Sequence, residues 1–370
     1  MGSIVAIRQC FEYDTEMILK HVEWLYTESD GPDPNGKKVL LKPNILSDDD
    51  PARATTTHPV VVEAVIKYLQ SRGATVFVGD SPTIDSWNFT GKRSGIRQVV
   101  DRCGATWVRF NQSDITRVVG SSSIKITEHV TEVDLIISLS KLKNHELMFF
   151  TGAIKNIFGF VPGFNKALQH AKHPDRYKLA KFFVDLEEVI RPHFHIMDGI
   201  VAMEGPGPGN GYPKKVNVLL ASVNPLALDI IASRIIGYDP LLIPTNKIAL
   251  ARGHLLKSVG DIIIRGPDPE TIVIGDFKRI ITGNAADILM RSFKNKVPFL
   301  RRFDKRPVFD SNLCISCLKC VEICPVEALR PGPDEKNKIL LNDKICIRCY
   351  CCHEVCRDNA IEIRRKFFRD

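Results

Sequence analysis

The chain has 370 residues, of which 44% are hydrophobic and 25% are charged, so it is long enough for two or three domains with a sizeable core. No apolar run reaches the roughly eighteen residues that a membrane-spanning helix needs, and the first residues do not resemble an export signal. We therefore expect a cytoplasmic protein that does not bind membranes. The formal net charge of +8 is modest and lacks an accompanying aromatic platform, which argues against nucleic-acid binding.

Strand-like and helix-like segments alternate along the first part of the chain. Val39–Leu41 and Thr75–Val78 are short apolar runs, and Thr55–Pro59 begins a helix between them with a polar cap and an early proline. Further strands are predicted at residues 106–110, 135–139, 194–197 and 216–220, and residues 261–265 and 271–274 are strand-like without an assigned place. This alternation predicts an α/β domain with a largely parallel sheet.

Polar side chains follow the predicted strands at the points where the strands end. The carboxyl ends of parallel strands share one edge of a sheet, and ligands bind in the crevice there. Each polar residue alone is equally consistent with a turn or a cap, but several at equivalent ends predict one polar cleft. Its expected substrate-binding residues are Lys42, Asn44, His58, Asp80, Ser81, Lys141, Lys155, Asn156, Asp198, Glu204 and Asp229.

Several lysines in such a cleft suit a small anionic ligand, either a carboxylate or a phosphate. Lys143 and His145 are the candidate catalytic residues, because protonation of a developing anion lowers its cost. Lys42 and Lys155 would stabilise the same charge electrostatically. The segment 205–211 has neither Walker-loop nor dinucleotide-fingerprint spacing and is predicted to be a flexible lid.

A metal site is the alternative interpretation of the same cleft. Imidazole and carboxylate side chains are suitable ligands, although no pair of histidines has helical spacing. The residues considered for it are His58, Asp80, His145, Asp198 and Glu204. Four other histidines, His170, His173, His193 and His195, are expected at the surface or in the core.

Several short motifs at these positions resemble the family called domain of unknown function 362. They are Lys42-Pro43-Asn44, Thr56-Thr57-His58-Pro59, Gly79-Asp80-Ser81-Pro82, the segment 141–145, the segment 151–159 and the segment 198–206. The resemblance spans about residues 37–240. It implies a fold, a site and, in many members, a ferredoxin-like tail. The activity of this family is unassigned, so no reaction follows from the resemblance.

A basic segment separates this region from the cysteine-rich end of the chain. Its charged residues are Arg291, Lys294, Lys296, Arg301, Arg302, Lys305 and Arg306, opposed only by Asp304. Such a run is typical of a solvated linker, and it could also steer an acidic redox partner. The expected domains are an α/β domain over residues 1–290, a linker over 291–306 and a ferredoxin domain over 307–370.

Eight of the eleven cysteines form two runs with the same C-x2-C-x2-C-x3-C spacing. In runs of this kind three cysteines bind one [4Fe–4S] cluster and the fourth ligates the other cluster. Cluster 1 is thus expected on Cys314, Cys317, Cys320 and Cys356, and cluster 2 on Cys346, Cys349, Cys352 and Cys324. Zinc usually takes two cysteine pairs separated by a longer loop, and a disulfide framework is unusual in so long a chain with few other cysteines.

The C-terminal segment resembles the bacterial ferredoxins that carry two [4Fe–4S] clusters, which implies a small α+β fold. Cys324 is followed by Pro325, as that pattern expects, whereas Cys356 is followed by Arg357. Cys351 is a spare thiol with a packing role expected. Exposed clusters oxidise readily, so an anaerobic or low-oxygen setting is expected.

Two functional hypotheses follow from these features. In the first, an oxidoreductase passes electrons from two [4Fe–4S] clusters to a small anionic substrate or cofactor in the α/β cleft. In the second, the protein is a non-enzymatic electron carrier or scaffold whose α/β domain binds a partner. Both hypotheses involve a redox partner protein, and they leave open whether the cleft holds a further organic cofactor or metal.

Overall fold

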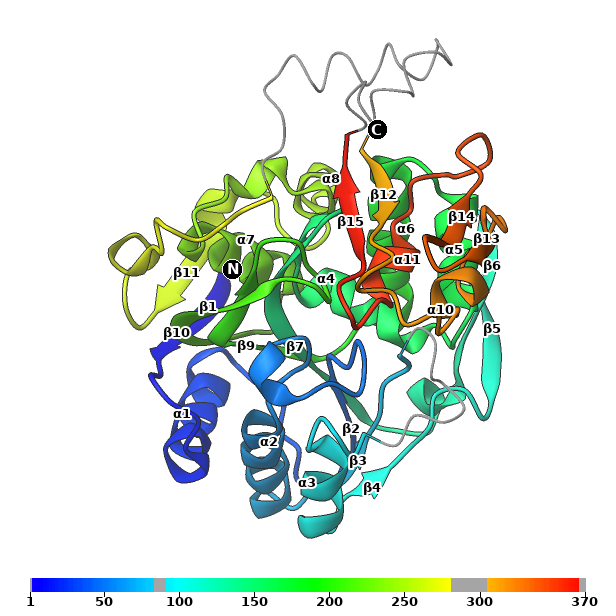
Figure 1. Cartoon of the computed structure of the whole chain (residues 1–370). Helices are drawn as coiled ribbons and strands as arrows, with labels where there is room; N and C mark the ends of the chain where they lie inside the picture. The colour runs from blue at the N-terminus through cyan, green and yellow to red at the C-terminus, as the bar shows by residue number, and fades with distance from the viewer. Residues whose placement is uncertain (1, 83–90, 281–304, 366–370) are drawn as a thin grey trace.

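The computed structural model describes residues 2–82, 91–280 and 305–365, and it places a small C-terminal domain against a layered α/β domain (Figure 1). Within these residues, a nine-stranded sheet has the order β11-β1-β10-β9-β7-β2-β3-β4, with β8 paired to β7. Its strands are β1 Ser3–Gln9, β2 Lys38–Pro43, β3 Thr75–Val78, β4 Thr106–Trp107, β7 Leu135–His145, β8 Phe149–Thr151, β9 Phe194–Glu204, β10 Tyr212–Ser222 and β11 Ile262–Arg265.

The five strands from β9 to β4 in this order run parallel to one another. Strand β10 is antiparallel to β9, β1 is antiparallel to β10, and β11 is parallel to β1. The sheet is therefore mixed and mostly parallel, which confirms the prediction of a largely parallel sheet. Residues 39–41 form a continuous apolar run because helices cover both faces of these strands.

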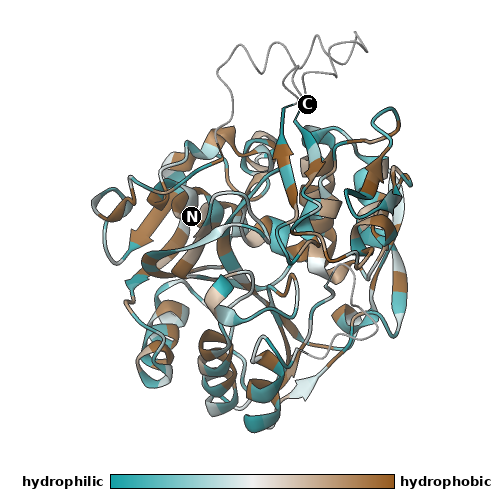
Figure 2. Cartoon of the chain, in the orientation of Figure 1, coloured by the Kyte–Doolittle hydropathy of each residue, from teal (hydrophilic) through white to brown (hydrophobic). Residues whose placement is uncertain are grey.

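Two layers of helices enclose the sheet. Apolar residues of α1 Thr15–Glu28, α2 Pro59–Ser71 and α3 Ile96–Arg102 pack with one face. Apolar residues of α6 Arg176–Ile190, α7 Pro225–Ile235, α8 Pro244–Arg252 and the short α4 Ala153–Asn156 pack with the other. Figure 2 shows hydrophobic and hydrophilic residues alternating along the helices that surround the sheet. Helix α5 Asn165–Lys172 and the hairpin of β5 Asp114–Val119 with β6 Ser122–Thr127 complete the domain.

Helix α2 begins where the sequence predicts. His58 is its N-cap, and the Nδ1 atom of His58 accepts a hydrogen bond from the backbone N–H of Val60. Pro59 occupies the first turn, where a missing N–H costs no hydrogen bond. His58 is thus a capping residue of this helix.

Several predicted element bounds differ from the structure. Strands β7, β9 and β10 extend beyond the predicted residues, whereas β4 covers only Thr106–Trp107. The strand predicted at 271–274 is wrong, because Pro269–Ile272 form a 3-10 turn after the Asp268 cap. Residues 262–265 do form a strand, β11, at the sheet edge. No helix in the described part of the chain is long and apolar enough to cross a lipid bilayer.

The C-terminal domain consists of short elements around the cysteine runs. Strand β12 Arg306–Phe309 pairs antiparallel with β15 Ile361–Arg364, and β13 Leu329–Asp334 pairs antiparallel with β14 Asn337–Leu341. The helices α10 Lys319–Glu322 and α11 Cys351–Glu354 each begin within one cysteine run. The expected small α+β architecture is present. Residues 291–304 of the expected linker lie outside the described residues, and Arg306 belongs to β12.

The C-terminal domain lies against residues that follow the strands of the sheet. The side chain of Asn210 donates a hydrogen bond to the carbonyl oxygen of His353, at 2.9 Å. Arg53 donates to the carbonyl oxygens of Gly209 and Arg357, at 3.2 and 3.3 Å. A Cβ atom on Gly209 would lie 2.9 Å from the carbonyl oxygen of Glu354, so a glycine allows this close approach.

The structure therefore does not support the prediction that segment 205–211 is a flexible lid. Residues 207–210 are buried, and the carbonyl oxygen of Gly207 accepts a hydrogen bond from the backbone N–H of Glu146 at 3.0 Å. Its glycines permit the backbone of the C-terminal domain to pack closely.

Candidate functional site

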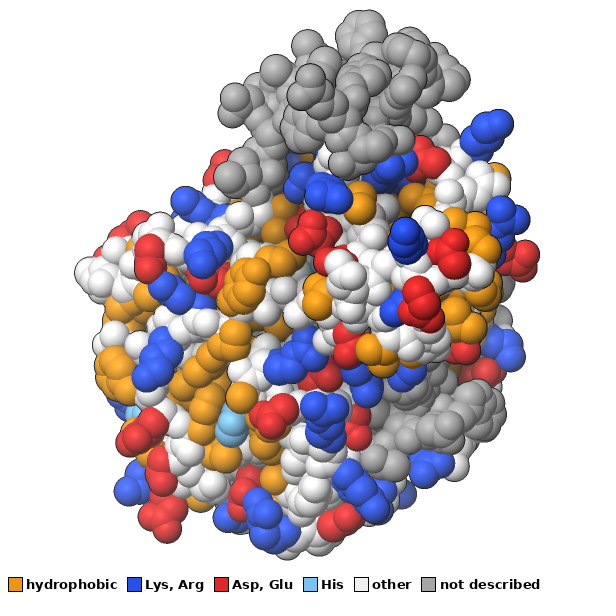
Figure 3. Space-filling model, viewed as in Figure 1, with side chains coloured by type: hydrophobic (Ala, Val, Ile, Leu, Met, Phe, Trp, Pro, Cys, Tyr) orange, Lys and Arg blue, Asp and Glu red, His pale blue; other side chains and the backbone are white. Residues whose placement is uncertain are grey.

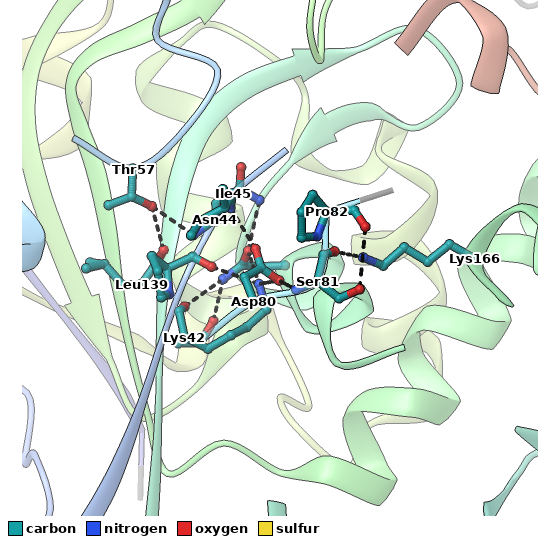
Figure 4. A network of polar contacts seen from close by, with 12 residues as sticks. Lys42, Asn44, Ile45, Thr57, Asp80, Ser81, Pro82, Leu139 and Lys166 are labelled. Atoms are coloured by element: carbon teal, nitrogen blue, oxygen red, sulfur yellow. Dashed lines mark hydrogen bonds and ion pairs between the residues drawn. The ribbon is translucent and has the colours of Figure 1, made fainter. Parts of the chain in front are cut away.

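A buried ion pair marks the ends of β2 and β3 (Figure 4). The Nζ atom of Lys42 lies 3.0 Å from Oδ1 of Asp80, and both side chains are almost fully buried. Lys42 also donates to the carbonyl oxygen of Pro43 and to Oδ1 of Asn156, at 2.9 and 3.0 Å. Burial lowers the pKa of Lys42, and the carboxylate of Asp80 opposes that shift. The pair is fully hydrogen-bonded, as a buried ion pair must be.

Backbone groups hold Asp80 in its position. Its carboxylate accepts hydrogen bonds from the N–H groups of Ile45 and Ser81, at 2.6 and 2.8 Å. Asn44 donates from Nδ2 to Oδ1 of Asn156 at 2.9 Å, which links the end of β2 to α4. The motifs that follow β2 and β3 in sequence therefore meet in space, as the cleft hypothesis predicted.

A cavity of about 60 Å³ lies beside this ion pair. This volume is large enough for several water molecules or a compact ligand. The lining residues include Lys42, Asn44, Asp80, Ser81, Lys143, Thr151, Lys155, Asn156, Lys166, His170, Cys351 and Glu354. The last two belong to helix α11 of the C-terminal domain, so both domains form the cavity.

Three lysines at the cavity have no carboxylate oxygen within ion-pair distance among the described residues. Lys143 donates instead to the carbonyl oxygen of Thr55, at 2.7 Å, and Lys166 donates to the carbonyl oxygen of Ser81. Lys155 contacts the ring of Phe183, with its Nζ 5.7 Å from the ring centroid. Burial is the main reason why the pKa values of all three lysines are lowered, and that of Lys166 falls to about 7.

His145 joins the α/β domain to Glu354 next to the cavity. Its Nδ1 accepts hydrogen bonds from the N–H groups of Leu147 and Met148, and its Nε2 lies 3.2 Å from Oε1 of Glu354. Burial lowers the pKa of His145 to about 3, so the ring is neutral near pH 7. His145 therefore lies against Glu354, and it is absent from the described residues that line the cavity.

The structure brings together only part of the predicted cleft. Lys42, Asn44, Asp80, Ser81, Lys143, Lys155 and Asn156 line one cavity. Lys141, Asp198 and His58 form a separate cluster with Tyr13. In that cluster the Nζ of Lys141 lies 2.7 Å from Oδ2 of Asp198, and the rings of Tyr13 and His58 stack with their centroids 3.5 Å apart.

Two further predicted ligand residues serve the backbone instead. Asp229 accepts hydrogen bonds from the N–H groups of Ala153 and Ile154, at 2.6 and 3.1 Å, where α4 begins. Glu204 accepts one from the N–H of Lys278 at 2.8 Å. The metal-site alternative is not supported either: across the described ranges, no group of three or more His, Cys, Asp or Glu side chains converges on a single-ion position.

The sequence reasoning missed the residues that close the cavity. Lys166 and His170 lie on α5, a helix that was not predicted, and His170 was assigned to the surface or core. Glu354 reaches the cavity only because the C-terminal domain docks there. The spare thiol Cys351 is buried against Ala167 and Ile323, in line with its expected packing role. No local motif signals these long-range contacts.

Each predicted cysteine quartet surrounds its own cavity of about 20 Å³. One is lined by Cys314, Cys317, Cys320 and Cys356, and the other by Cys324, Cys346, Cys349 and Cys352. Burial raises the pKa of the Cys320 thiol to about 12, and the neighbouring Cys356, Cys317 and Cys314 thiols add to the shift. The fourth cysteine of each run thus lies with the first three of the other run, which fits the cross-ligation expected for paired clusters.

Comparison with known proteins identifies the α/β domain. The sequence profile of the domain of unknown function 362 matches residues 39–234. A thylakoid-associated protein of Synechocystis sp. is 32% identical over 280 residues, which cover 74% of this chain and 86% of that protein. The chain belongs to the domain of unknown function 362 family. A profile described as a 4Fe-4S binding domain also matches residues 307–330, so this family member carries at least one iron–sulfur cluster site.

Two solved structures are distantly similar to this family member. The lactate racemase apoprotein of Thermoanaerobacterium thermosaccharolyticum is 14% identical, with a TM-score of 0.40 over 60% of this chain. A Thermotoga maritima protein is 18% identical, with a TM-score of 0.33 over 54% of this chain. The chain spans about half the length of each, covering 54% and 52% of them.

A substitution at Gly159 tests the packing beside the ion pair. A Cβ atom there would collide with Oδ1 of Asp80 and with Cε of Lys42. We expect Gly159→Ala to destabilise the protein by about 1–3 kcal/mol, because the clash forces the buried pair apart. Urea unfolding of the wild type and of Gly159→Ala measures this difference in the free energy of unfolding. Gly36→Ala is a comparison for loop strain, since Gly36 has a positive φ but no atom within 4 Å of an added Cβ.

Proposed function

We propose that this protein is an iron–sulfur electron-transfer protein with two [4Fe–4S] clusters and a small-anion site in the cavity of the α/β domain. Cluster 1 would bind to Cys314, Cys317, Cys320 and Cys356, and cluster 2 to Cys346, Cys349, Cys352 and Cys324. When bound, such clusters accept and donate single electrons. In the oxidoreductase form of this proposal, the anion is the substrate and a one-electron donor protein is the reductant.

One observation carries the proposal. Cys351 lines both the cavity of about 60 Å³ and the cavity surrounded by the second cysteine quartet. Glu354, from the same helix, lines the first cavity as well. A ligand held among the lysines would therefore lie one side chain away from the second quartet. An α/β domain that only supported the ferredoxin-like tail would not need a cationic cavity at this contact.

The residues of the cavity have separate roles in this proposal. The ammonium groups of Lys143, Lys155 and Lys166 attract and hold an anion, and the Lys42–Asp80 pair keeps the wall of the cavity in place. Lys166 is the proton donor in this proposal, because it lines the cavity and burial lowers its pKa to about 7. Lys166 thus takes the proton-donating role that the sequence suggested for His145, and Lys143 remains a candidate for the same role.

The first quartet is the part of the C-terminal domain that a partner protein would approach. Cys317 is exposed, and next to it the side chains of Leu313 and Ile315 are 50% and 67% exposed. Exposed apolar residues around a redox centre favour transient docking of another protein. The visible face in Figure 3 carries interspersed positive and negative side chains, which suits weak and reversible association.

This exposed edge also supports a second candidate function, a non-enzymatic electron carrier. The two functions differ in which residues matter. For the carrier, replacing Lys305 and Arg306 by Ser slows reduction by a partner protein, and replacing Lys155 by Met has no effect. For the oxidoreductase, Lys155→Met abolishes the response to the anion, and the basic residues affect only the rate of partner reduction.

An anaerobic titration tests the proposal. The full-length protein, loaded with iron and sulfide, is reduced with dithionite, freed of excess reductant and mixed with a panel of carboxylates and phosphates. We expect at least one anion to change the electron paramagnetic resonance of the reduced protein or to reoxidise it. The anion site is refuted if no member of the panel has an effect on the wild type, and the carrier function is then the better description.

The location of the protein is part of the proposal. The cytoplasmic assignment expected from the sequence is retained, although the Synechocystis relative is thylakoid-associated. Fractionation of cells at low and high salt distinguishes the alternatives, because a protein held at a membrane surface by charge is released by salt.

A further inference from the structure

The charges around the cavity do not balance. Four lysines line it, Lys42, Lys143, Lys155 and Lys166, together with the carboxylates of Asp80 and Glu354. Asp80 is paired with Lys42 at 3.0 Å, and Glu354 contacts His145 at 3.2 Å. If all of these lysines and carboxylates are ionised, the excess is two positive charges.

Such an excess is costly in a buried site unless a counter-ion is present. Removing a charge from water costs several kcal/mol, which a nearby opposite charge or deprotonation must offset. The lowered pKa values of Lys143, Lys155 and Lys166 have burial as their largest cause. A ligand carrying two negative charges would offset the excess, whereas a monoanion would leave part of it.

Neutral groups at the same cavity also lack partners. Oγ1 of Thr151 and Nδ1 of His170 are buried atoms without a hydrogen-bond partner, and both residues line the cavity. A hydroxyl and an imidazole N–H can each donate to an oxyanion. Oδ1 of Asn44 is likewise buried and without a partner, and it can accept only from an O–H or N–H group of the ligand.

These groups together describe the ligand. Several donors surround a compact space, and two positive charges are in excess. Two buried acceptors, Oδ1 of Asn44 and Oε1 of Glu354, have no hydrogen-bond partner among the described residues, which suits a ligand that also carries a hydroxyl. We infer that the cavity binds a doubly charged phosphoryl group, either inorganic phosphate or a small phosphate monoester, with Lys155 and Lys166 as its principal cations and with uptake of a proton by Lys166. This inference rests on the anion site of the proposed function and names its ligand class. The phosphoryl group is not itself reduced: in the oxidoreductase form it is the binding group of a phosphate monoester whose organic part accepts the electrons.

The direction of proton transfer follows from the surroundings of Lys166. Its pKa of about 7 reflects burial first, then the opposing effects of Asp80 and Glu354 and of the cations Lys42 and Lys155. His170 lies four residues along the same helix, and burial keeps it neutral. At pH 8, above this pKa, Lys166 is mostly unprotonated before binding, so a bound dianion draws in up to one proton. At pH 6, below this pKa, Lys166 is already mostly protonated and takes up much less.

Calorimetry on the full-length, cluster-loaded protein under anaerobic conditions tests the inference. Inorganic phosphate, glycerol phosphate, succinate and acetate are titrated at pH 8 in Tris and in HEPES, whose ionisation enthalpies differ. We expect phosphate or its monoester to bind at least about tenfold more tightly than acetate, because a monoanion leaves one buried charge unbalanced, which is worth a factor of ten or more. Succinate is a dianion like phosphate, but its two charges lie on separate carboxylates, so we expect it to bind more weakly than a phosphoryl group that concentrates both charges in one compact group. The apparent binding enthalpies in the two buffers should differ by close to the difference between the ionisation enthalpies of the buffers, which corresponds to the uptake of one proton.

Variants assign the effect to the named residues. Lys155→Met and Lys166→Met should each weaken phosphate binding at least about tenfold, and Lys166→Met should also remove most of the proton uptake. Lys166→Arg should retain binding without the uptake, since arginine stays charged. Lys172→Met is the matched control, because Lys172 is an exposed residue of the same helix. Iron content and circular dichroism establish that each variant is folded.

The possible failures are distinguishable. If succinate or acetate binds as tightly as phosphate, the phosphoryl assignment is overturned while the anion site of the proposed function stands. If phosphate binds with the same heat in both buffers, the proton uptake is refuted. If none of the four anions binds, the anion site itself fails along with this inference.

Discussion

Lys42→Met is expected to destabilise the protein by about 3–5 kcal/mol, because it leaves the carboxylate of Asp80 buried without its counter-ion. Asp80 is 6% exposed, and its remaining partners are two backbone N–H groups. The substitution also removes the hydrogen bond from Lys42 to Asn156, which connects β2 to α4. Reversible urea unfolding, or the shift in melting temperature where unfolding is irreversible, measures the loss.

Two further variants separate charge from packing. The double variant Lys42→Met with Asp80→Asn should recover part of the lost stability, because the amide carries no charge and its oxygen can still accept one of the two backbone hydrogen bonds, from Ile45 or from Ser81. The ion pair of Arg97 with Asp101 is the surface comparison, with side chains 35% and 56% exposed. Arg97→Met should cost less than about 0.5 kcal/mol. If Lys42→Met costs no more than Arg97→Met, the pair is not the buried anchor described above.

Cys352→Ala is expected to remove one of two clusters and to lower the iron content of anaerobically purified protein from about eight to about four per chain. Cys352 lies among the thiols of Cys349, Cys346 and Cys324, and its loss leaves that quartet with three ligands. Cys351→Ala is the matched control. Cys351 is adjacent in sequence and buried, but it is not a proposed ligand, so the iron content should stay near eight.

The cross-ligation makes a sharper prediction than the iron count. Cys324→Ala should affect the same electron paramagnetic resonance signal as Cys352→Ala, although Cys324 belongs to the first run in sequence. Cys356→Ala should affect the other signal, together with Cys314→Ala. If Cys324→Ala instead matches Cys314→Ala, each run holds its own cluster. If the wild type binds only four irons, the proposal of two clusters is wrong.

Local patterns were sufficient for the scaffold of the site. The apolar runs before Lys42 and before Asp80 identify two strands, and in a parallel sheet their carboxyl ends must be neighbours. The repeated cysteine spacing likewise specifies the quartets, because chemistry restricts how a short turn can present thiols to a cluster. Both predictions, the two strands and the two quartets, depend only on a few consecutive residues.

The same patterns failed where polar residues serve the protein rather than a ligand. Asp198 and Lys141 lie at strand ends, as the rule expects, but they pair with each other at 2.7 Å away from the cavity. Asp229 resembles a ligand residue by charge and acts as a cap for the start of α4. A strand end places a side chain at the sheet edge, and packing against the next layer determines which side chain remains available.

The electrostatic character of the cavity arises from contacts between residues far apart in the chain. Lys166 comes from a helix that carries no motif, and Glu354 comes from the C-terminal domain, which docks beside residues 207–210. Burial costs depend on every neighbour at once, so neither the lowered pKa of Lys166 nor the unpaired state of Lys155 is encoded locally. Spacing in the chain predicted which cysteines lie together in each quartet, whereas tertiary packing selected the cations that face the cavity.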